Sequence, residues 1–326
     1  MEGVMMKNGA QYAVAVRKPD GEIIVDIEEY KGILSDTKIK KLPFVRGVVS
    51  FVESLVLGMK TLMYSASFFD EEETDGNKGH GKGNQNARYD AQDAEDLVRA
   101  DGQEDRQYAK RRMQDKGYEK QKDSVIMGMT VAVSVLAAVV IFMLIPYFIS
   151  SLFQQWISSQ IVLAVLEGGL RMAIFFAYIL LISRLEDIQR VFMYHGAEHK
   201  CINCIEHGME LNVENVRKSS RLHKRCGTSF LFLVVCISII FFLFIHTDSG
   251  LMRIVVRLLL VPVIAGCAYE FIRLAGRSDN ALVDLLSKPG MALQKLTTRE
   301  PDDSMIEVGI ASVEAVFDWK AYIIEK

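Results

Sequence analysis

The sequence has little of what marks several common protein classes. Its 326 residues include only six prolines and five cysteines, and the formal net charge is −3. A chain without a positive excess has no global field that attracts polyanions, so we predict that it does not bind nucleic acid. The cysteines are odd in number and do not follow the regular spacings of a small secreted protein stapled by disulfides. We therefore expect free thiols in a reducing compartment.

No secretory signal peptide is visible, because residues 1–17 lack a charged start followed by an apolar run. Charge is missing instead from long internal stretches. Residues 125–149 contain no charged side chain, over a length that matches the roughly 20 residues needed to cross a hydrocarbon core. Three further apolar stretches follow at 161–182, 230–245 and 251–272. We predict a mainly α-helical integral membrane protein with about four transmembrane helices.

A few charges do interrupt these apolar stretches. Glu167 and Arg171 are four residues apart around two glycines, and such a pair is costly in lipid unless it faces protein or water. We interpret it as a mutually neutralising pair inside a helix bundle, with a broken helix or a polar cavity as the alternative. Together with Arg257, the pair also leaves a transporter open as a less favoured function, although no internal repeat is visible.

The N-terminal part predicts a small α+β element outside the membrane. Residues 13–17 and 22–27 alternate in part and flank Pro19-Asp20-Gly21, which is typical of a β-hairpin. Residues 42–66 have helical apolar spacing but contain three charges, which favours an amphipathic helix on the membrane or on the hairpin over a transmembrane helix. Residues 70–123 are almost wholly polar and predict a disordered linker.

The C-terminal part predicts a soluble helix. Pro289-Gly290 indicates a break after the fourth apolar stretch. Pro301, followed by Asp302 and Asp303, then opens a helix with acidic groups where the helix dipole favours them. We expect this last helix to pack back on the hairpin.

The distribution of basic residues predicts the orientation. Lys and Arg are frequent before the first apolar stretch, in residues 184–227 and after residue 273, whereas the two short connections contain none. The positive-inside rule then places both termini and the 184–227 segment in the cytoplasm. The lipid bilayer is the expected partner, and an unknown membrane or cytoplasmic protein or a second copy of the chain is compatible with this picture.

The predicted parts are 1–69 (hairpin and amphipathic helix), 70–123 (linker), 124–183 (transmembrane helices 1 and 2), 184–227 (site segment), 228–273 (transmembrane helices 3 and 4) and 274–326 (C-terminal helix).

Metal-ligand side chains are concentrated in one cytoplasmic stretch, because residues 194–226 hold four of the six histidines and three of the five cysteines. The apolar pattern continues from the second apolar stretch to Ile202, which predicts one long helix with His195 and His199 on its inward face. Two histidines four residues apart can bind one metal ion, and Glu198 between them can act as a general base. This H-x-x-E-H order is that of the inverted zinc peptidases.

The third ligand is left open by the sequence. Glu270, near the cytoplasmic end of the fourth apolar stretch, is one candidate. The other is His223 with Cys226, an i,i+3 pair that follows a short predicted helix from Val213 to Ser219 capped by Asn212. Imidazole and thiolate both suit Zn²⁺, although another divalent transition metal would also fit.

The remaining cysteines and one histidine are weaker candidates. Cys201, Cys204 and His207 form a C-x-x-C-x-x-H run, but the two cysteines share a face with each other more than with His195. We interpret them as small apolar residues instead of ligands. The apolar stretches contain the other two cysteines, Cys236 and Cys267, which we assign to packing.

Several segments together carry a family resemblance: Glu2–Met6, Pro43–Val49, Tyr194–Lys200, Val213–Arg217, Arg225–Phe230, Ala268–Glu270 and Leu296–Asp303. In these segments the chain resembles the YqhQ-like bacterial membrane proteins, a domain of unknown function described as predicted metal-dependent enzymes. Family members begin with a Gly-Gly-Gln-Ala segment that this chain lacks, and they do not need cysteines at 201 and 204. The resemblance implies as site residues His195, Glu198, His199, His223, Cys226 and Glu270, and adds Glu2 as a polar residue of the site.

Two functions follow from these observations. The first is a metal-dependent membrane enzyme, a hydrolase by reaction class, with Glu198 as the base. The second is a non-enzymatic membrane protein in which the cluster of histidines and cysteines only clamps the cytoplasmic segment, while the hairpin and the tail bind a partner. The two functions differ in what they require of Glu198.

Overall fold

The computed structural model describes residues 2–30, 32, 42–68, 128–245, 249–277 and 280–325. The chain divides into two units, Met1–Phe69 with Phe148–Lys326, and Asp70–Tyr147. Of the second unit, the structure describes residues 128–147, which belong to the apolar helix Gly128–Leu152. That helix includes a π-helical segment, η2 (Val140–Leu144), followed by α4 (Ile145–Leu152). The predicted linker at 70–123 lies outside the described residues.

A three-stranded antiparallel sheet forms near the N-terminus. The predicted hairpin is confirmed, since Val16 pairs with Ile24 across a turn in which Gly21 has a φ of 89°. A further strand was not predicted, and it joins the hairpin through the two-residue turn Gly9-Ala10. The strands, in spatial order, are β1 (Gly3–Asn8), β2 (Gln11–Arg17) and β3 (Ile23–Glu29).

One face of the sheet is covered by the helix α11 (Asp303–Val316), which confirms that the C-terminal part packs back on the hairpin. Asp302 caps this helix by accepting a hydrogen bond from the Met305 amide. On its other side α11 packs against α6 (Glu186–Glu206), and the two helices come so close that a Cβ on Gly309 would lie 3.0 Å from the Cys201 sulfur. The core between the sheet, α6 and α11 includes Val4, Met6, Ala13, Ala15, Tyr194, Ala197, Met305, Ile306 and Val308.

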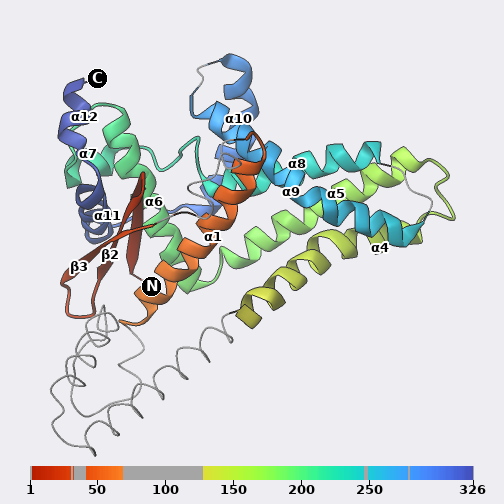
Figure 1. Cartoon of the computed structure of the whole chain (residues 1–326), viewed down its shortest axis with the longest axis horizontal. Coiled ribbons are helices and arrows are strands. Elements are labelled where there is room, and N and C mark those ends of the chain that lie inside the picture. The colour runs from red at the N-terminus through yellow and green to blue at the C-terminus, as the bar shows by residue number, and fades with distance from the viewer. Residues whose placement is uncertain are drawn as a thin grey trace, which may run out of the picture. The chain divides into compact units, whose positions relative to one another are not determined.

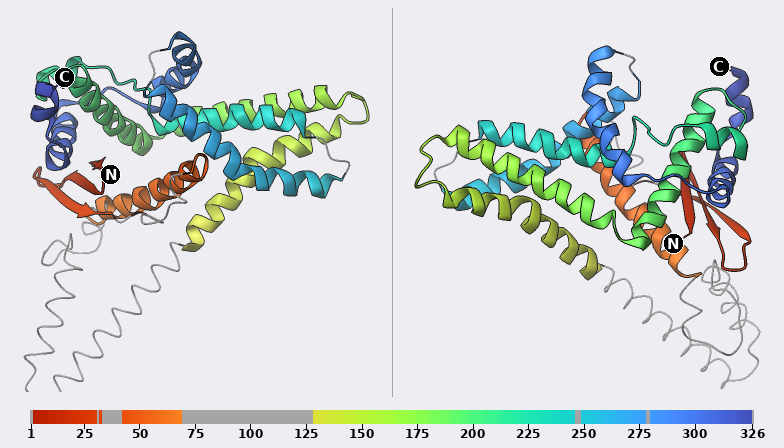
Figure 2. Two further views of the ribbon diagram at one scale, coloured as in Figure 1. Left: turned by 45° about the horizontal axis from the view of Figure 1, so that its top comes forward. Right: turned by 180° about the vertical axis from the view of Figure 1, so that it is seen from behind.

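Three long helices extend away from this part of the first unit, as Figures 1 and 2 show. They are α5 (Gln160–Ile182), α8 (Gly227–Phe244) and α9 (Gly250–Ala275). Within the described residues five helices are long and apolar enough to cross a membrane: these three, Gly128–Leu152 and α1 (Val45–Ala66). We expected about four such helices. The count differs because α1 also qualifies by length and composition.

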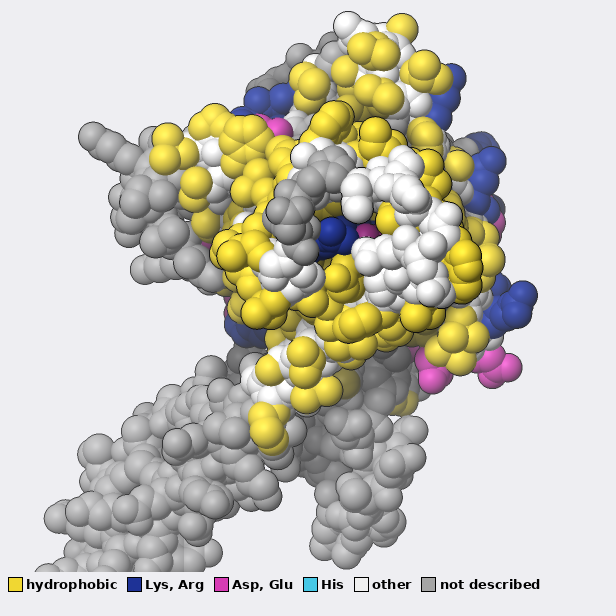
Figure 3. All heavy atoms as spheres, turned by 90° about the vertical axis from the view of Figure 1, so that its right-hand side faces the viewer, with side chains coloured by type: hydrophobic (Ala, Val, Ile, Leu, Met, Phe, Trp, Pro, Cys, Tyr) yellow, Lys and Arg dark blue, Asp and Glu magenta, His cyan; other side chains and the backbone are white. Residues whose placement is uncertain are grey.

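The predicted charge pair is buried between these helices. Glu167 binds Arg171 of its own helix at 2.9 Å and Arg257 of α9 at 2.6 Å, and each of the three is at most 5% exposed. Both guanidinium groups also stack over the Phe242 ring of α8. Because α5 runs unbroken through this site, the alternative of a broken helix is excluded, and the charges lie between helices of the bundle as predicted. Arg257 makes the group one carboxylate with two guanidinium groups, so it is not the mutually neutralising pair that we predicted. Figure 3 views the ends of the helices, where a hollow bordered in part by hydrophobic side chains has basic and acidic side chains at its bottom.

Helix α1 has two packing partners within the first unit. Leu57 packs against Tyr12, Val14 and Val16 of β2, which agrees with a helix lying on the hairpin. Near its start α1 packs against α9, and a Cβ on Gly47 would lie only 2.8 Å from the Tyr269 side chain.

Two predicted helix boundaries were wrong. The second apolar helix does not continue through the histidines, because α5 ends at Ile182 and α6 begins at Glu186 after a turn. Nor does Pro289 break the chain, since it lies inside α10 (Ala281–Thr297). Buried Gln294 of α10 binds the main chain of His223 at both its N–H and its carbonyl, and this packing stabilises the helix despite the proline. Two short helices complete the described fold: α7 (Val213–Lys218), which was predicted, and α12 (Trp319–Glu325) near the C-terminus.

Candidate metal centre

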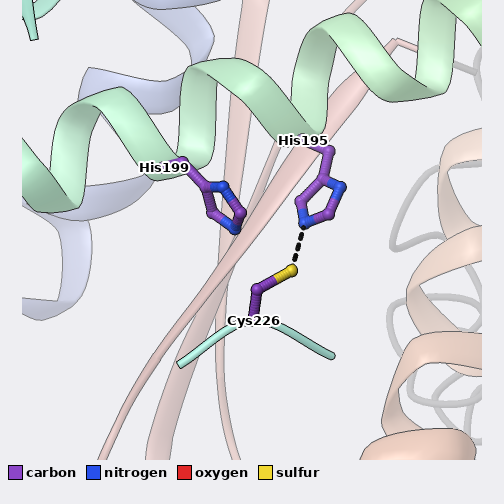
Figure 4. Close-up of side chains that lie close together, drawn as sticks. All are labelled: His195, His199 and Cys226. Carbon is purple, nitrogen blue, oxygen red and sulfur yellow. Dashed lines mark hydrogen bonds between the residues drawn. The ribbon is translucent and has the colours of Figure 1, made fainter. Parts of the chain in front are cut away.

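Helix α6 presents two histidines on one face. His195 and His199 are four residues apart, so their side chains lie one above the other along the helix. Their ring centroids are 4.4 Å apart. Both side chains point away from the α6 axis towards the same loop, as Figure 4 shows.

The third side chain comes from that loop. Cys226 is the N-cap residue of α8, and its sulfur accepts a hydrogen bond from the Thr228 amide. The same sulfur lies 3.2 Å from Nε2 of His195. One donor atom from each of His195, His199 and Cys226 lies within 4.8 Å of the other two, which is close enough for one metal ion to reach all three.

Main-chain carbonyls fix the orientation of both imidazoles. Nδ1 of His195 lies 3.0 Å from the carbonyl oxygen of Thr297, and Nδ1 of His199 lies 2.7 Å from that of Arg221. A carbonyl oxygen only accepts hydrogen bonds, so Nδ1 is the protonated nitrogen in each ring. The Nε2 atoms are thereby the ones available to a metal, and metal-binding histidines in proteins are held in this way.

The metal-free cluster pairs a thiolate with a protonated imidazole, so the sulfur is in its metal-binding form while a metal must displace a proton from His195. Burial alone raises the pKa of the Cys226 thiol, but hydrogen bonds from His195 and His199 outweigh it and lower this pKa to about 5. Burial lowers the pKa of His195, whereas the bond to Cys226 raises it, with a net result of about 9. The sulfur is therefore a thiolate at neutral pH, which is the form that binds metals.

Glu198 is placed for proton transfer. It is half-buried beside the cluster, and burial raises the pKa of its carboxyl group. Its carboxylate makes no hydrogen bond or ion pair to any residue that the structure describes. It lines a cavity of about 490 Å³ together with His195, His199 and Cys226, and a second cavity of about 290 Å³ bordered by β1. An unpaired acid at this position can accept a proton from a molecule in either cavity.

Comparison with known proteins identifies the family. The model of a family described as "Protein of unknown function (DUF1385)" matches residues 42–319. The chain belongs to this family. A relative in Bacillus subtilis (strain 168), named "Uncharacterized protein YqhQ", is 32% identical over 317 residues, which cover 96% of this chain and 88% of the relative. No solved structure matches the chain.

The DUF1385 match includes His195, His199, Cys226 and Glu198, but it begins after the sheet. The longer alignment with the Bacillus protein covers nearly the whole chain.

His223 lines the cavity of about 490 Å³ but does not belong to the cluster of His195, His199 and Cys226. Its Nε2 lies 3.1 Å from a carboxylate oxygen of Glu206, which also binds Arg225. Its ring centroid is 5.8 Å from that of His199. The predicted pair of His223 and Cys226 is therefore split, with only the cysteine among the three clustered donors.

The structure does not bring Glu270 to the histidines. This carboxylate belongs to α9, and both of its oxygens bind the guanidinium of Arg46 on α1, one of them at 2.6 Å. Among the described residues, Glu270 is not part of the group around His195 and His199. The position of Glu270 near the cytoplasmic end of the fourth apolar stretch suggested that it lies level with the histidines. The packing of α1 beside α9 gives its carboxylate another partner instead.

The remaining candidates lie outside the cluster. Cys201 is fully buried against α11, and Cys204 lies 3.4 Å from the carbonyl of Glu210. His207 ends α6 and lies 2.6 Å from the carbonyl of Asn203. Glu2 binds Arg190 at 2.6 Å and accepts a hydrogen bond from Tyr194 at 2.7 Å, which places it beside the smaller cavity.

Three supporting residues were not predicted. Lys200 donates hydrogen bonds to the carbonyls of Arg217 and Ser219, and Asn203 donates to those of Ser220 and Leu222. Both side chains thereby hold the loop whose Arg221 carbonyl orients His199. Buried polar residues on an otherwise apolar helix face were the sequence signal for this role.

The third is Gly196, in the middle of the histidine motif. A Cβ at this position would lie 2.1 Å from the carbonyl oxygen of Arg299. The lack of a side chain allows the 297–299 segment to approach α6, where the Arg299 amide donates to the Phe192 carbonyl at 2.9 Å. Glycine is therefore needed for the Thr297 carbonyl to reach His195.

Proposed function

We propose that the chain is a metal-dependent hydrolase of the bacterial cytoplasmic membrane, with Zn²⁺ or another divalent transition metal bound by His195, His199 and Cys226. The observation that carries the proposal is the convergence of three donor atoms within 4.8 Å on a cavity that also contains the unpaired carboxylate of Glu198.

The membrane setting rests on the apolar helices. We assign Gly128–Leu152, α5, α8 and α9 as spans, and α1 as a helix at the membrane surface because Leu57 packs on the sheet. Basic residues are frequent in the segments that carry the site, so the positive-inside rule supports a cytoplasmic site and cytoplasmic termini.

The donor set fits zinc. Two imidazole nitrogens and one thiolate are ligands that Zn²⁺ binds in catalytic sites, where three protein ligands leave a fourth position open. All three residues line the cavity of about 490 Å³, so that a fourth position on this side would be accessible to a substrate. When bound, the ion would supply Lewis acidity and lower the pKa of a water molecule.

The protein residues then have separate tasks. Glu198 accepts the proton of the attacking water and can return it to the leaving group, a task that the raised pKa of its carboxyl group suits. The carbonyls of Thr297 and Arg221 keep the Nε2 atoms of the two histidines directed at the metal position. Ile202, Val313 and Phe317 give the cavity an apolar wall that would take an apolar part of the substrate.

A structural clamp is the second candidate function, and one observation favours it. The cluster and its carbonyl partners connect α6 to the start of α8 and to the end of α10. A metal there would hold these three segments together without any chemistry, leaving the sheet and the C-terminal helices for a partner protein.

Metal analysis of the purified full-length protein tests the proposal. We expect about one Zn²⁺ per chain, as in other mononuclear sites, and its loss in the double variant His195→Ala/His199→Ala. His207→Ala is the matched control, because this exposed histidine ends the same helix outside the cluster and should leave the metal content unchanged. Wild-type protein without stoichiometric metal refutes the proposal.

Glu198→Gln then separates the two candidate functions. Hydrolysis of a panel of chromogenic carboxylic and phosphoric esters should fall by about 100-fold or more in this variant, with the metal retained, if Glu198 is the base. A structural clamp predicts instead that the wild type hydrolyses none of them and that the variant changes only thermal stability.

A further inference from the structure

A third cavity, separate from the metal centre, is bordered by Leu296, Arg299 and Glu300. It has a volume of about 450 Å³ and shares no lining residue with the cavity of about 490 Å³ at the metal centre. Its lining consists of Ser183, Met193, Arg221, Lys295, Leu296, Arg299 and Glu300.

The charges around this cavity are mainly positive. Arg221, Lys295 and Arg299 face a single acid, Glu300. That acid already binds the buried Lys200 at 2.9 Å. Arg221 lies farther from it, at 3.6 Å. The cavity therefore keeps an excess of positive charge that an anion could neutralise.

The two arginines are held in place by the main chain. Arg221 donates to the carbonyl of Thr298 at 2.9 Å, and Arg299 donates to that of Ser183 at 3.3 Å. Each guanidinium carries five N–H donors in a fixed plane, so most remain for a ligand, in the geometry that suits phosphate oxygens. Lys295 is exposed and makes no hydrogen bond or ion pair within the described part of the chain.

The position of the cavity adds an apolar component. Ser183 is the C-cap residue of α5, which we assign as a membrane span, so the cavity lies where this helix leaves the bilayer. Met193 and Leu296 supply apolar surface next to the cations. Basic pockets beside the cytoplasmic ends of spans suit the headgroups of anionic lipids.

We propose that this cavity is a binding site for a phosphate group. The group belongs either to the headgroup of an anionic phospholipid or to a soluble phosphate monoester, since both present the same oxygens to Arg221, Lys295 and Arg299. The proposal is independent of the metal chemistry, although the choice of a lipid uses the assignment of α5 as a span.

Native mass spectrometry of the delipidated full-length protein tests the proposal, with phosphatidylglycerol or phosphatidylcholine added at equal concentration. We expect phosphatidylglycerol to bind more tightly, and Lys295→Gln/Arg299→Gln to weaken its binding roughly 30-fold, about fivefold for each cation. Lys295→Gln alone, a change at an exposed side chain that does not threaten folding, should show the fivefold loss. Lys218→Gln/Lys320→Gln removes two exposed cations elsewhere and is the matched control.

The soluble source is tested by calorimetric titration of the same proteins with glycerol 1-phosphate. Binding of this compound with the same loss in the cavity variants, and without binding of phosphatidylglycerol, assigns the site to a soluble monoester. Equal binding of both lipids and no binding of glycerol 1-phosphate overturns the proposal, as does an equal loss in the control variant. His195→Ala/His199→Ala must keep the phosphate affinity, because its loss there would place the anion at the metal centre.

Discussion

Replacing Gly196 by alanine should damage the metal centre without touching a ligand. The added Cβ would lie 2.1 Å from the carbonyl oxygen of Arg299, so the 297–299 segment must move by about 1.5 Å to reach an ordinary contact distance. Overpacking of this kind costs about 1–3 kcal/mol, and the lost hydrogen bond from the Arg299 amide to Phe192 costs about 1 kcal/mol more. The better helix propensity of alanine returns about 1 kcal/mol. We expect a net loss of about 1–3 kcal/mol in the free energy of unfolding.

The same shift should weaken metal binding. It moves the Thr297 carbonyl away from Nδ1 of His195, and losing such an orienting partner costs about 10-fold to 100-fold in metal affinity. Competition with a chromogenic chelator measures the affinity, and thermal denaturation in detergent measures the stability. Gly58→Ala is the control, because a Cβ there meets no atom within 4 Å in the middle of α1. If Gly196→Ala binds Zn²⁺ as tightly as Gly58→Ala does, the role assigned to the 297–299 segment is wrong.

The other predictions concern the charged groups. In chelator-treated protein, iodoacetamide should modify Cys226 at pH 7 far faster than Cys204, because the pKa of Cys226 is lowered to about 5 and burial raises that of Cys204. The rate at Cys226 should fall as the pH drops through 5, and added Zn²⁺ should protect this thiol from modification. Equal rates at the two cysteines, measured by mass spectrometry, would contradict the thiolate. Glu270→Gln should keep the metal and lower the free energy of unfolding by about 1 kcal/mol or less, since the ion pair between Glu270 and Arg46 of α1 is partly exposed. Loss of Zn²⁺ from this variant in metal analysis would show that Glu270 is a ligand. Glu167→Gln leaves two buried guanidinium groups without this carboxylate and should lower the free energy of unfolding, measured by thermal denaturation, by about 3–5 kcal/mol. The loss should be smaller when Arg257→Met is added to this variant. A loss only as large as that of Glu270→Gln would show that the buried charges are solvated.

Local patterns predicted the elements that local interactions determine. The hairpin at Pro19-Asp20-Gly21, the short helix capped by Asn212 and the acidic start of α11 all form as expected, because turn and capping residues act on their immediate neighbours. The strand β1 was missed although a glycine at the first position of a two-residue turn, as Gly9 is here, is a hairpin signal. Its two methionines carry no strand preference, and it is buried because α11 and α6, which are distant in the sequence, pack against it.

The site was predictable only up to the point where distant segments meet. The spacing of His195 and His199 follows from the helix, but the choice between Cys226 and Glu270 depends on how α8 and α9 pack. Arg46, far away in the sequence, takes Glu270 as its partner, and no local pattern indicates this. Whether a metal is bound stays a prediction for the experiments above.

The orientation of both histidines depends on backbone atoms alone, at Thr297 and Arg221. Every residue type carries a carbonyl, so a side-chain scan of these two positions would not reveal what their main-chain oxygens do. Deletion of one residue between 217 and 222, or between 294 and 299, would instead turn the carbonyl away and leave the imidazole nitrogen without a partner. The metal centre is thus encoded in the lengths of two short segments as much as in the identity of its ligands, and insertions or deletions are the changes by which a related chain would lose it.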